Sequence, residues 1–455
     1  MNKSDLYALL DRRADDFGEI AGALWDYAEM AFRETKSAAL LCDVLEREGF
    51  TVERGVAGIP TAFTATYGAG SPHIGILGEY DALSGLAQTA GSAVQDPPTD
   101  QPGHGCGHNL LGSGALAAAV AIKEYLADHP GRVTYFGCPA EEGGSGKAFM
   151  ARDGVFDGLD AALSWHPGAR NNIAAGSTLA NYQVLYRFHG VASHAGGSPH
   201  LGRSALDAVT LMNVGAQFLR EHIPTTARLH YAVVDTGGFS PNVVQARAAV
   251  LYLMRLPEVT DLPELYERVN DIAKGAALMT GTTVEIEFVK GCSNMLLNTP
   301  LMKLMYDNLT ATDALTYTAD EEALGQEIRK TFTADDVFPY AMDIDPLEET
   351  ETPGTGSTDV GDVSWVCPTA YCYMACKPLD TPGHSWQMTS MSKTQTAYRA
   401  MMRAAKTIVG TAVDLYENPA LLDDIRADFK KRLDGRTYTC PIPKDVVPRA
   451  LDDLK

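Results

Sequence analysis

Apolar residues recur every three or four positions through the first fifty residues, which is the spacing of one face of a helix. Leu6, Leu10, Ile20 and Leu24 form the first such stripe, and a second runs through residues 40–45. We therefore expect helices over residues 4–49. Short runs rich in apolar and β-branched residues follow and predict strands. Beyond residue 50 the expected strands are 51–53, 61–67, 74–78, 132–137 and 160–165, with helices over 110–126 and 147–152.

Strands that alternate with helices in this way indicate an α/β fold with a mainly parallel sheet and helices on both faces. Near Tyr182 the rhythm changes. The elements then follow the order β-α-β-β-α-β, which is the ferredoxin-like plan. The simplest account is an inserted second domain. Its expected strands are 182–189, 228–236, 248–255 and 282–289, and its helices are 204–222 and 262–279.

The first domain is expected to resume after the insertion, because a further histidine motif lies near residue 384. We predict a first domain over residues 1–181, a ferredoxin-like domain over 182–295, and the rest of the first domain with a tail over 296–455. The expected elements of this last part are a helix over 301–309, strands within 363–377 and a long helix over 390–416, with the tail after 418 wrapping the surface and no element assigned to 331–355.

Composition narrows the possible partners. The formal net charge of −21 argues against binding to nucleic acid or to an anionic membrane surface. The amino terminus lacks a signal-like apolar core, and no run reaches the roughly 18 apolar residues that a membrane helix needs. We therefore expect a cytoplasmic protein. The eight cysteines are sparse and irregular, unlike a disulfide framework, and the pair Cys372 and Cys376 is typical of core packing.

The segment Gly105-Cys106-Gly107-His108 places a thiol and an imidazole two positions apart. Such a pair suits a transition metal, although a buried thiol beside a capping histidine explains it equally well when it is taken alone. Other potential ligands follow apolar runs farther along the chain, and their number favours the metal. These are the pair Glu141 and Glu142, His166 in Ser164-Trp165-His166-Pro167, and His384 in Pro382-Gly383-His384-Ser385.

Five ligands suffice to hold two divalent ions if one of the ligands bridges them. A bridging thiolate favours manganese, zinc or cobalt over magnesium or calcium. We expect Mn²⁺ or Zn²⁺. The predicted ligands are Cys106, His108, Glu142, His166 and His384.

Glu141 is the candidate general base, because adjacent side chains on a tight turn diverge and one carboxylate can face a water while the other binds metal. The alternative is that Glu141 and Glu142 are two solvated loop residues. Asp81 is expected to orient a ligand imidazole, with a plain turn residue as the alternative. His104, although close to Cys106, is not expected to be a ligand.

Several longer motifs resemble the M20 family of metallo-aminoacylases and peptidases, in particular the amidohydrolase branch that carries a metal-binding Cys-x-His. The resemblance extends over most of the chain. Two places depart from it: residues 324–353, and Gly383 ahead of His384. The motifs that carry the resemblance are Gly78-Glu79-Tyr80-Asp81-Ala82-Leu83, the segment 103–112, Glu141-Glu142-Gly143-Gly144-Ser145-Gly146-Lys147, the segment 198–209 and the segment 357–365.

The resemblance implies a two-metal catalytic domain interrupted by a lid domain that also makes a dimer contact. It implies that His194 reaches the partner subunit's active site and supports the oxyanion. Asn242 matches the family's lid asparagine, and Arg255 matches an arginine that clamps a substrate carboxylate. From the residues alone, His194 is a turn histidine and Arg255 a charge at a strand end.

The function that the resemblance implies is metal-dependent hydrolysis of the amide bond of an N-acyl amino acid, with p-aminobenzoyl-glutamate as the leading substrate. Hydrolysis of an indole-acetyl-amino acid, of another N-acyl amino acid or of a dipeptide is the alternative within the same chemistry. Two other classes stay open: a hydrolase with Cys106 as nucleophile and His108 as base, and a non-catalytic scaffold. Whether the partner is a second copy or a related subunit is also open.

Overall fold

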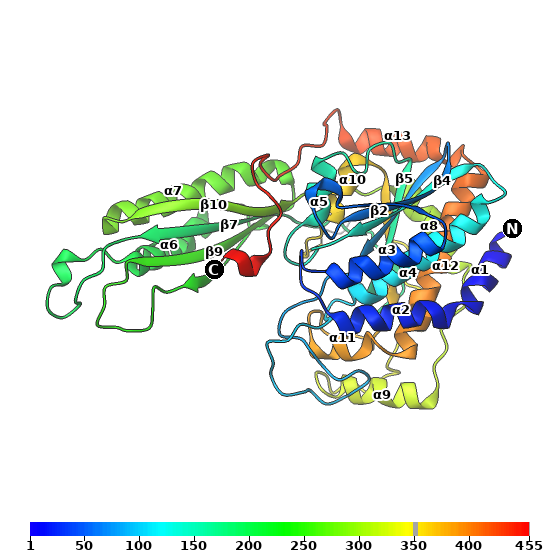
Figure 1. Cartoon of the computed structure of the whole chain (residues 1–455), viewed down its shortest axis with the longest axis horizontal. Coiled ribbons are helices and arrows are strands. Elements are labelled where there is room, and N and C mark those ends of the chain that lie inside the picture. The colour runs from blue at the N-terminus through cyan, green and yellow to red at the C-terminus, as the bar shows by residue number, and fades with distance from the viewer. Residues whose placement is uncertain (349–353, 455) are drawn as a thin grey trace. The chain divides into compact units, whose positions relative to one another are not determined.

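The computed structural model describes residues 1–348 and 354–454, and the chain forms two compact units (Figure 1). Unit 1 comprises Met1–Gly176, Leu296–Thr352 and Val363–Tyr438, and unit 2 comprises Ser177–Met295, Pro353–Asp362 and Thr439–Lys455. The division differs from the expected one in three short segments, the first of which is residues 177–181, which belong to unit 2. Residues 354–362 and 439–454 pack with unit 2, whereas the sequence suggested the first domain. No element was predicted for residues 331–355, and residues 349–353 of that segment lie outside the described residues.

A seven-stranded sheet forms the centre of unit 1, in the order β1-β2-β4-β3-β5-β11-β6. The neighbours β4, β3, β5 and β11 run parallel, and antiparallel pairs flank them on both sides. The expected mainly parallel sheet is confirmed, with mixed edges. The strands are β1 (Thr51–Arg54), β2 (Phe63–Ala69), β3 (His73–Glu79), β4 (Gly131–Cys138), β5 (Ala161–Gly168), β6 (Asn172–Ile173) and β11 (Thr369–Ala375).

The helix α4 (His108–Leu126) is rich in alanine and glycine, whose small side chains let it pack closely on this sheet. Nearly its whole surface is buried. A Cβ at Gly112 would lie 2.6 Å from the carbonyl oxygen of Glu79, so only glycine lets the helix approach the end of β3. The long helix α12 (Gln395–Glu417) packs beside α4. The other helices of unit 1 include α1 (Lys3–Arg12), α2 (Ala14–Tyr27), α3 (Thr35–Arg47), α5 (Gly146–Arg152) and α8 (Thr299–Thr310).

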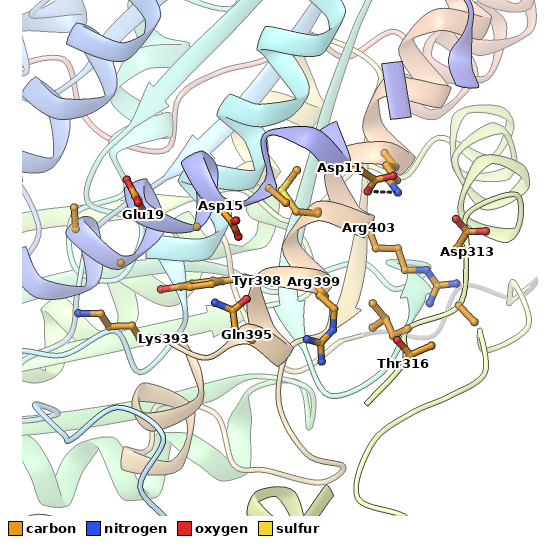
Figure 2. Close-up of a pocket in the computed structure, with 18 of the residues that line it drawn as sticks. Asp11, Asp15, Glu19, Asp313, Thr316, Lys393, Gln395, Tyr398, Arg399 and Arg403 are labelled. Atoms are coloured by element: carbon orange, nitrogen blue, oxygen red, sulfur yellow. Dashed lines mark ion pairs between the residues drawn. The ribbon is translucent and has the colours of Figure 1, made fainter. Parts of the chain in front are cut away.

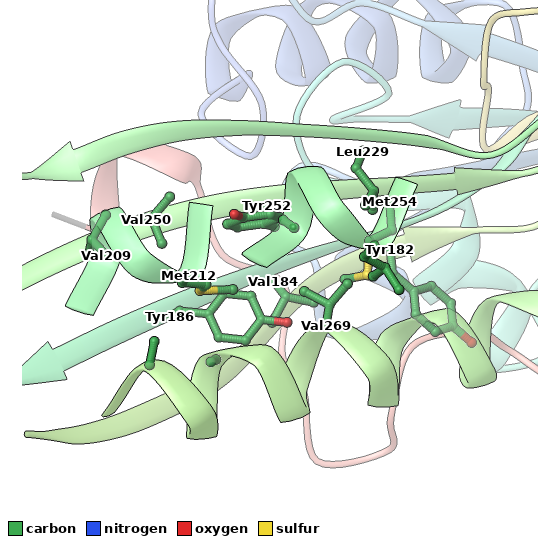
Figure 3. Close-up of a cluster of buried hydrophobic side chains, with 14 of the residues drawn as sticks. Tyr182, Val184, Tyr186, Val209, Met212, Leu229, Val250, Tyr252, Met254 and Val269 are labelled. Atoms are coloured by element: carbon green, nitrogen blue, oxygen red, sulfur yellow. The ribbon is translucent and has the colours of Figure 1, made fainter. Parts of the chain in front are cut away.

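Unit 2 has a four-stranded antiparallel sheet in the order β10-β7-β9-β8, with two helices in the chain order β-α-β-β-α-β. Its core lies between the sheet and the helices, where Tyr186 and Tyr252 meet edge to face and Met212 and Val269 fill the remaining space (Figure 3). The predicted ferredoxin-like plan is confirmed. The elements are β7 (Ala180–His189), α6 (Ala205–Leu219), β8 (Arg228–Asp235), β9 (Arg247–Leu256), α7 (Leu262–Thr280) and β10 (Thr283–Cys292).

Some element predictions were wrong in the second half of the chain. Residues 363–366 were expected to lie in a strand but belong to the helix α10 (Val360–Val366). Residues 363–365 are buried, and periodicity cannot separate strand from helix in so short a buried run. The tail forms the helix α13 (Leu421–Leu433), whose buried side is only Leu422 and Ile425. The helices α9 (Ala319–Arg329) and α11 (Trp386–Met391) were not predicted as separate elements.

None of the described helices is both long and apolar enough to cross a membrane.

Candidate metal centre

The five predicted ligands lie in unit 1, at or beyond the carboxyl ends of its parallel strands. Cys106 stands in the turn before α4, and His108 is the first residue of that helix. Glu142 follows β4, His166 lies near the end of β5, and His384 precedes α11. Because parallel strands end at one edge of a sheet, loops far apart in sequence meet there. The fold thus brings side chains from four parts of the chain to one place.

The donor atoms of these residues form two groups that share the Cys106 sulfur. One group is Cys106, His108 and His166, and the other is Cys106, Glu142 and His384; within each group the atoms lie within 4.8 Å of one another. The Cys106 Sγ lies 3.4 Å from His166 Nε2, and Glu142 Oε1 lies 3.3 Å from His384 Nε2. Two three-atom groups joined at a thiolate have the composition of a dinuclear centre.

His108 offers an imidazole nitrogen that the described residues leave without a hydrogen bond. Its Nδ1 lies 2.8 Å from Asp81 Oδ1, while its buried Nε2 has no hydrogen-bond partner in the described part of the chain and lies 3.3 Å from Glu79 Oε2. Asp81 Oδ2 also accepts a hydrogen bond from the Glu142 backbone N–H at 2.9 Å. Asp81 thus holds the His108 ring through Nδ1, while Nε2 faces the other candidate ligand atoms. This arrangement is typical of a histidine that binds a metal and is oriented by a carboxylate.

The electrostatics of the cluster favour a thiolate among cationic imidazoles. Burial disfavours ionisation of the Cys106 thiol, but the adjacent His108 and His166 outweigh it and hold the pKa of the thiol well below its usual value. Hydrogen bonds to Cys106 and Glu142 raise the pKa of His384 to about 10. Burial, and then the Cys106 charge, raise the pKa of Glu142 to about 7. His384, and in part Glu142, therefore hold protons near neutral pH that a bound cation would displace, whereas Cys106 is already a thiolate.

Glu141 lies beside this cluster on the turn that also carries Glu142. One of its carboxylate oxygens lies within 4.8 Å of the ligand atoms of His108 and Glu142. The preceding residue, Ala140, has a φ of 62°, a left-handed conformation that turns the chain sharply after β4. The two adjacent carboxylates thus reach the same small region.

Comparison with known proteins identifies the family of this chain. The pattern of Peptidase family M20/M25/M40 matches residues 75–421. The chain belongs to this family. Among its relatives, one subunit of the p-aminobenzoyl-glutamate hydrolase of Escherichia coli (strain K12) is 47% identical over 96% of each chain, and the Xaa-Arg dipeptidase of Mus musculus is 31% identical over 93% of this chain and 91% of the relative.

The fold agrees with solved M20 structures. A Bacillus subtilis protein described as a dinuclear metal-binding peptidase of the M20 family shares the fold with a TM-score of 0.56 and 16% identity, over 90% of this chain and 99% of that one. The expected family and enzyme class are therefore confirmed, and the protein is an M20 metallo-hydrolase rather than a hydrolase with a cysteine nucleophile.

The M20 hydrolase contains buried charged residues near the cluster that sequence reasoning did not single out. Lys147 Nζ and Glu79 Oε1 form an ion pair of 2.6 Å, and both side chains are almost wholly buried. Glu34, which is also fully buried, accepts hydrogen bonds from the Thr61 hydroxyl and from the Ala140 N–H. Glu79 and Lys147 stand in motifs that resemble the M20 family, which was the available signal, whereas nothing in the sequence marked Glu34.

His104, which was not expected to be a ligand, is buried and lies outside the donor groups. Its Nε2 lies 3.0 Å from the Leu24 carbonyl oxygen, to which it can only donate.

Three further candidates lie in unit 2. His194 Nδ1 accepts hydrogen bonds from the backbone N–H groups of Gly196 and Gly197, which leaves Nε2 as the N–H donor. The Ala195 N–H donates to the Asn242 carbonyl, so the loops that carry His194 and Asn242 are joined. Arg255 lies near the carboxyl end of β9, where its Nη1 donates to the Ser357 hydroxyl at 2.8 Å.

Proposed function

We propose that this M20 hydrolase cleaves the amide bond of an N-acyl amino acid, with p-aminobenzoyl-glutamate as its substrate. The observation that carries the proposal is the pair of donor groups joined at Cys106 in a chain that is 47% identical to its E. coli relative over 96% of both lengths. A cytoplasmic location stays the prediction from sequence.

The donor set suits two divalent ions, which we propose to be Mn²⁺ or Zn²⁺. Cys106 would bridge, with His108 and His166 on one side and Glu142 and His384 on the other. The thiolate and imidazole nitrogens favour these metals over magnesium and calcium. When bound, such ions polarise a carbonyl group and lower the pKa of water.

Glu141 is the proposed general base. Its carboxylate would take a proton from the attacking water and return it to the leaving nitrogen, so that the amine departs neutral. Its position beside His108 and Glu142 supports this role, because the reacting water must lie near the same atoms. Asp81 would hold the His108 ring through Nδ1.

The three candidate residues of unit 2 lie toward opposite ends of its sheet, with Arg255 at one end and the loops of His194 and Asn242 at the other. Arg255 pairs with Asn181 across β9 and β7, at the end of the sheet where the chain enters and leaves unit 2, while His189 pairs with Arg247 at the opposite end. The eight residue steps from Arg247 to Arg255 span roughly 26 Å of strand. The loops of His194 and Asn242 follow the far end. One lid therefore cannot bring Arg255 and His194 to the same substrate without a large rearrangement.

We infer that Arg255 binds the substrate carboxylate in its own subunit, while His194 and Asn242 donate hydrogen bonds to the developing oxyanion in a partner subunit. The edge strand β8 offers a surface for that partner, because Tyr231, Val233 and Val234 are exposed along an unpaired edge. The partner is a second copy of this chain or a related chain, since the E. coli relative is itself named as one subunit of its enzyme.

The test combines metal analysis with a substrate panel. The purified protein should contain two equivalents of metal, lose activity on chelation and regain it with Mn²⁺ or Zn²⁺. p-Aminobenzoyl-glutamate should be cleaved much faster than p-aminobenzoyl-alanine, which lacks the side-chain carboxylate. Preferential cleavage of a dipeptide ending in arginine would instead favour the activity named for the mouse relative. Full activity in the chelated, metal-free protein would refute the proposal.

A further inference from the structure

A cavity of about 690 Å³ lies in unit 1, outside the metal centre (Figure 2). Its walls are α2, the carboxyl end of α1, the segment 313–316 and one side of α12. None of the five candidate metal ligands lines it. The volume is in the range of small-molecule sites in proteins.

One wall of the cavity holds a buried cation that forms no ion pair with a carboxylate of the described residues. Arg403 is only 5% exposed, and in Figure 2 its side chain extends away from α12 toward the side of Asp313 and Thr316. Its one hydrogen bond within the described chain runs from Nε to the Thr312 hydroxyl at 2.9 Å, and its buried Nη1 has no partner. A buried charge left unpaired is costly, so such a group indicates a ligand that pairs with it.

The other cations at the cavity already have partners, which singles out Arg403. Arg399, one turn earlier on α12, donates to Glu321 at 2.6 Å. Lys406 pairs with Asp11 at 2.7 Å, and Lys393 pairs with Asp26 at 2.5 Å.

The same cavity carries carboxylates that lack cationic partners among the described residues, namely Asp15, Glu19 and Asp313. Figure 2 shows Asp313 on the side of Arg403, and Asp15 and Glu19 farther along α2. Burial lowers the pKa of Arg403, and Asp313 is one of several groups whose charge opposes this. A simple anion would meet these carboxylates as well as Arg403. A zwitterion would satisfy both kinds of group.

Another part of the cavity lining is a close fit between α2 and α12. A Cβ at Gly18 would lie 3.2 Å from Tyr398 Cδ2, and one at Gly22 would lie 3.1 Å from the Tyr398 hydroxyl oxygen. The two glycines, one helical turn apart, thus leave room for the tyrosine ring. This wall is a specific packing arrangement rather than a loose gap between helices.

We propose that this cavity binds a free α-amino acid, with its carboxylate on Arg403 and its ammonium group on Asp313. The adjacent charges of an α-amino acid match the two neighbouring side chains. A guanidinium binds a carboxylate through two parallel hydrogen bonds, which suits the unpaired side of Arg403. The inference does not depend on the proposed reaction, because it uses none of the metal-centre residues.

Isothermal titration calorimetry on the metal-loaded protein tests the proposal, with L-alanine, L-glutamate, succinate and ethylamine as probes. The amino acids should bind, whereas succinate and ethylamine, which each carry one kind of charge, should bind at least about tenfold more weakly. His384→Ala, which disables the metal centre, should retain this binding. If His384→Ala abolishes it, the amino acid binds at the metal centre and the proposal fails.

Arg403→Met should weaken amino-acid binding at least about tenfold, because it removes the carboxylate partner. Arg399→Met is the matched control, because Arg399 lies on the same helix but already has Glu321 as its partner. Amino-acid affinity of this variant should stay within about twofold of the wild type. Asp313→Asn, at an exposed position, should weaken the binding of the amino acids but not that of succinate. This variant keeps the test valid if Arg403→Met fails to fold. Equal binding to the wild type, Arg403→Met and Asp313→Asn, or no binding of amino acids at all, would overturn the proposal.

Discussion

Glu34 accepts a hydrogen bond from the backbone N–H of Ala140 at 2.9 Å, across 106 residues of sequence. Its other oxygen accepts from Thr61, and the side chain is fully buried. The bond fixes the left-handed turn from which Glu141 and Glu142 reach the candidate metal centre. Glu34 is therefore a positioning residue for the two carboxylates.

Glu34→Ala should destabilise the fold by about 1–3 kcal/mol, because it leaves the buried Ala140 N–H unsatisfied. It should also lower kcat more than it changes KM, since the general base would lose its position. Glu34→Gln keeps an acceptor for that N–H and should stay near wild type at about pH 5, where Glu34 in the folded protein is protonated. Denaturant unfolding and steady-state kinetics of the two variants provide the check; equal losses in both variants would show that the charge, not the hydrogen bond, matters.

Glu34 also predicts a pH dependence of stability. Burial, and then the Asp81 charge, raise its pKa to about 8, whereas a carboxyl in the unfolded chain titrates near its usual value of 4.5. Between these values the folded state binds more protons than the unfolded state, so this residue makes the free energy of unfolding fall as pH rises from about 5 to about 8. The stability advantage of Glu34→Gln over wild type should grow over that interval, as measured by urea unfolding at several pH values. A constant difference would contradict the raised pKa.

The pair of Lys147 and Glu79 should behave as a buried ion pair. Lys147→Met alone leaves the Glu79 carboxylate buried without its 2.6 Å partner, and a loss of about 3–5 kcal/mol is expected. Adding Glu79→Gln should recover part of this loss. A double-mutant cycle measured by denaturant unfolding gives the coupling energy, and strictly additive losses would exclude a direct interaction.

Asp81→Asn should weaken metal binding by about 10–100-fold, because Asp81 orients His108 through Nδ1 and also accepts the Glu142 N–H. Asp96→Asn is the control, since the Asp96 carboxylate accepts hydrogen bonds from Thr89 in an exposed loop. Competition with a chelator of known affinity measures the effect. Retention of metal by Asp81→Asn at wild-type strength would leave Asp81 as a plain turn residue.

Sequence patterns predicted the fold of unit 2 well, because its strands alternate and its helices carry clear apolar stripes, as in β7 and α7. They failed for α13, where a charged helix buries only two residues and gives almost no periodic signal. Cys106 and His108 could be chosen from their spacing, and Glu142, His166 and His384 because each follows an apolar run with a short motif. Glu34 could not, because its role comes from a contact with Ala140, which is distant in the sequence.

The neighbours Glu141 and Glu142 give a matched pair of variants. Glu141→Ala should keep two metals and lower kcat by at least about 10³-fold, since it removes the general base. Glu142→Ala should instead lose metal, because it removes a donor from the group with Cys106 and His384. Metal content by mass spectrometry and kcat separate the two effects. Loss of metal in both variants, or in neither, would contradict the assigned roles.

Subunit mixing tests whether His194 acts across a dimer, as its position at the far end of the lid sheet from Arg255 suggests. His194→Ala and Glu141→Gln chains should each be inactive alone. In their mixed dimer, the site with an intact Glu141 faces an intact His194 from the other chain. Random exchange makes about half of the molecules mixed, so activity should recover to about one quarter of wild type. Arg255→Met mixed with Glu141→Gln is the control: because Arg255 serves the site of its own chain, both sites of that dimer stay defective and no recovery is expected. Recovery in both mixtures, or in neither despite formation of mixed dimers, would contradict this division of the lid residues.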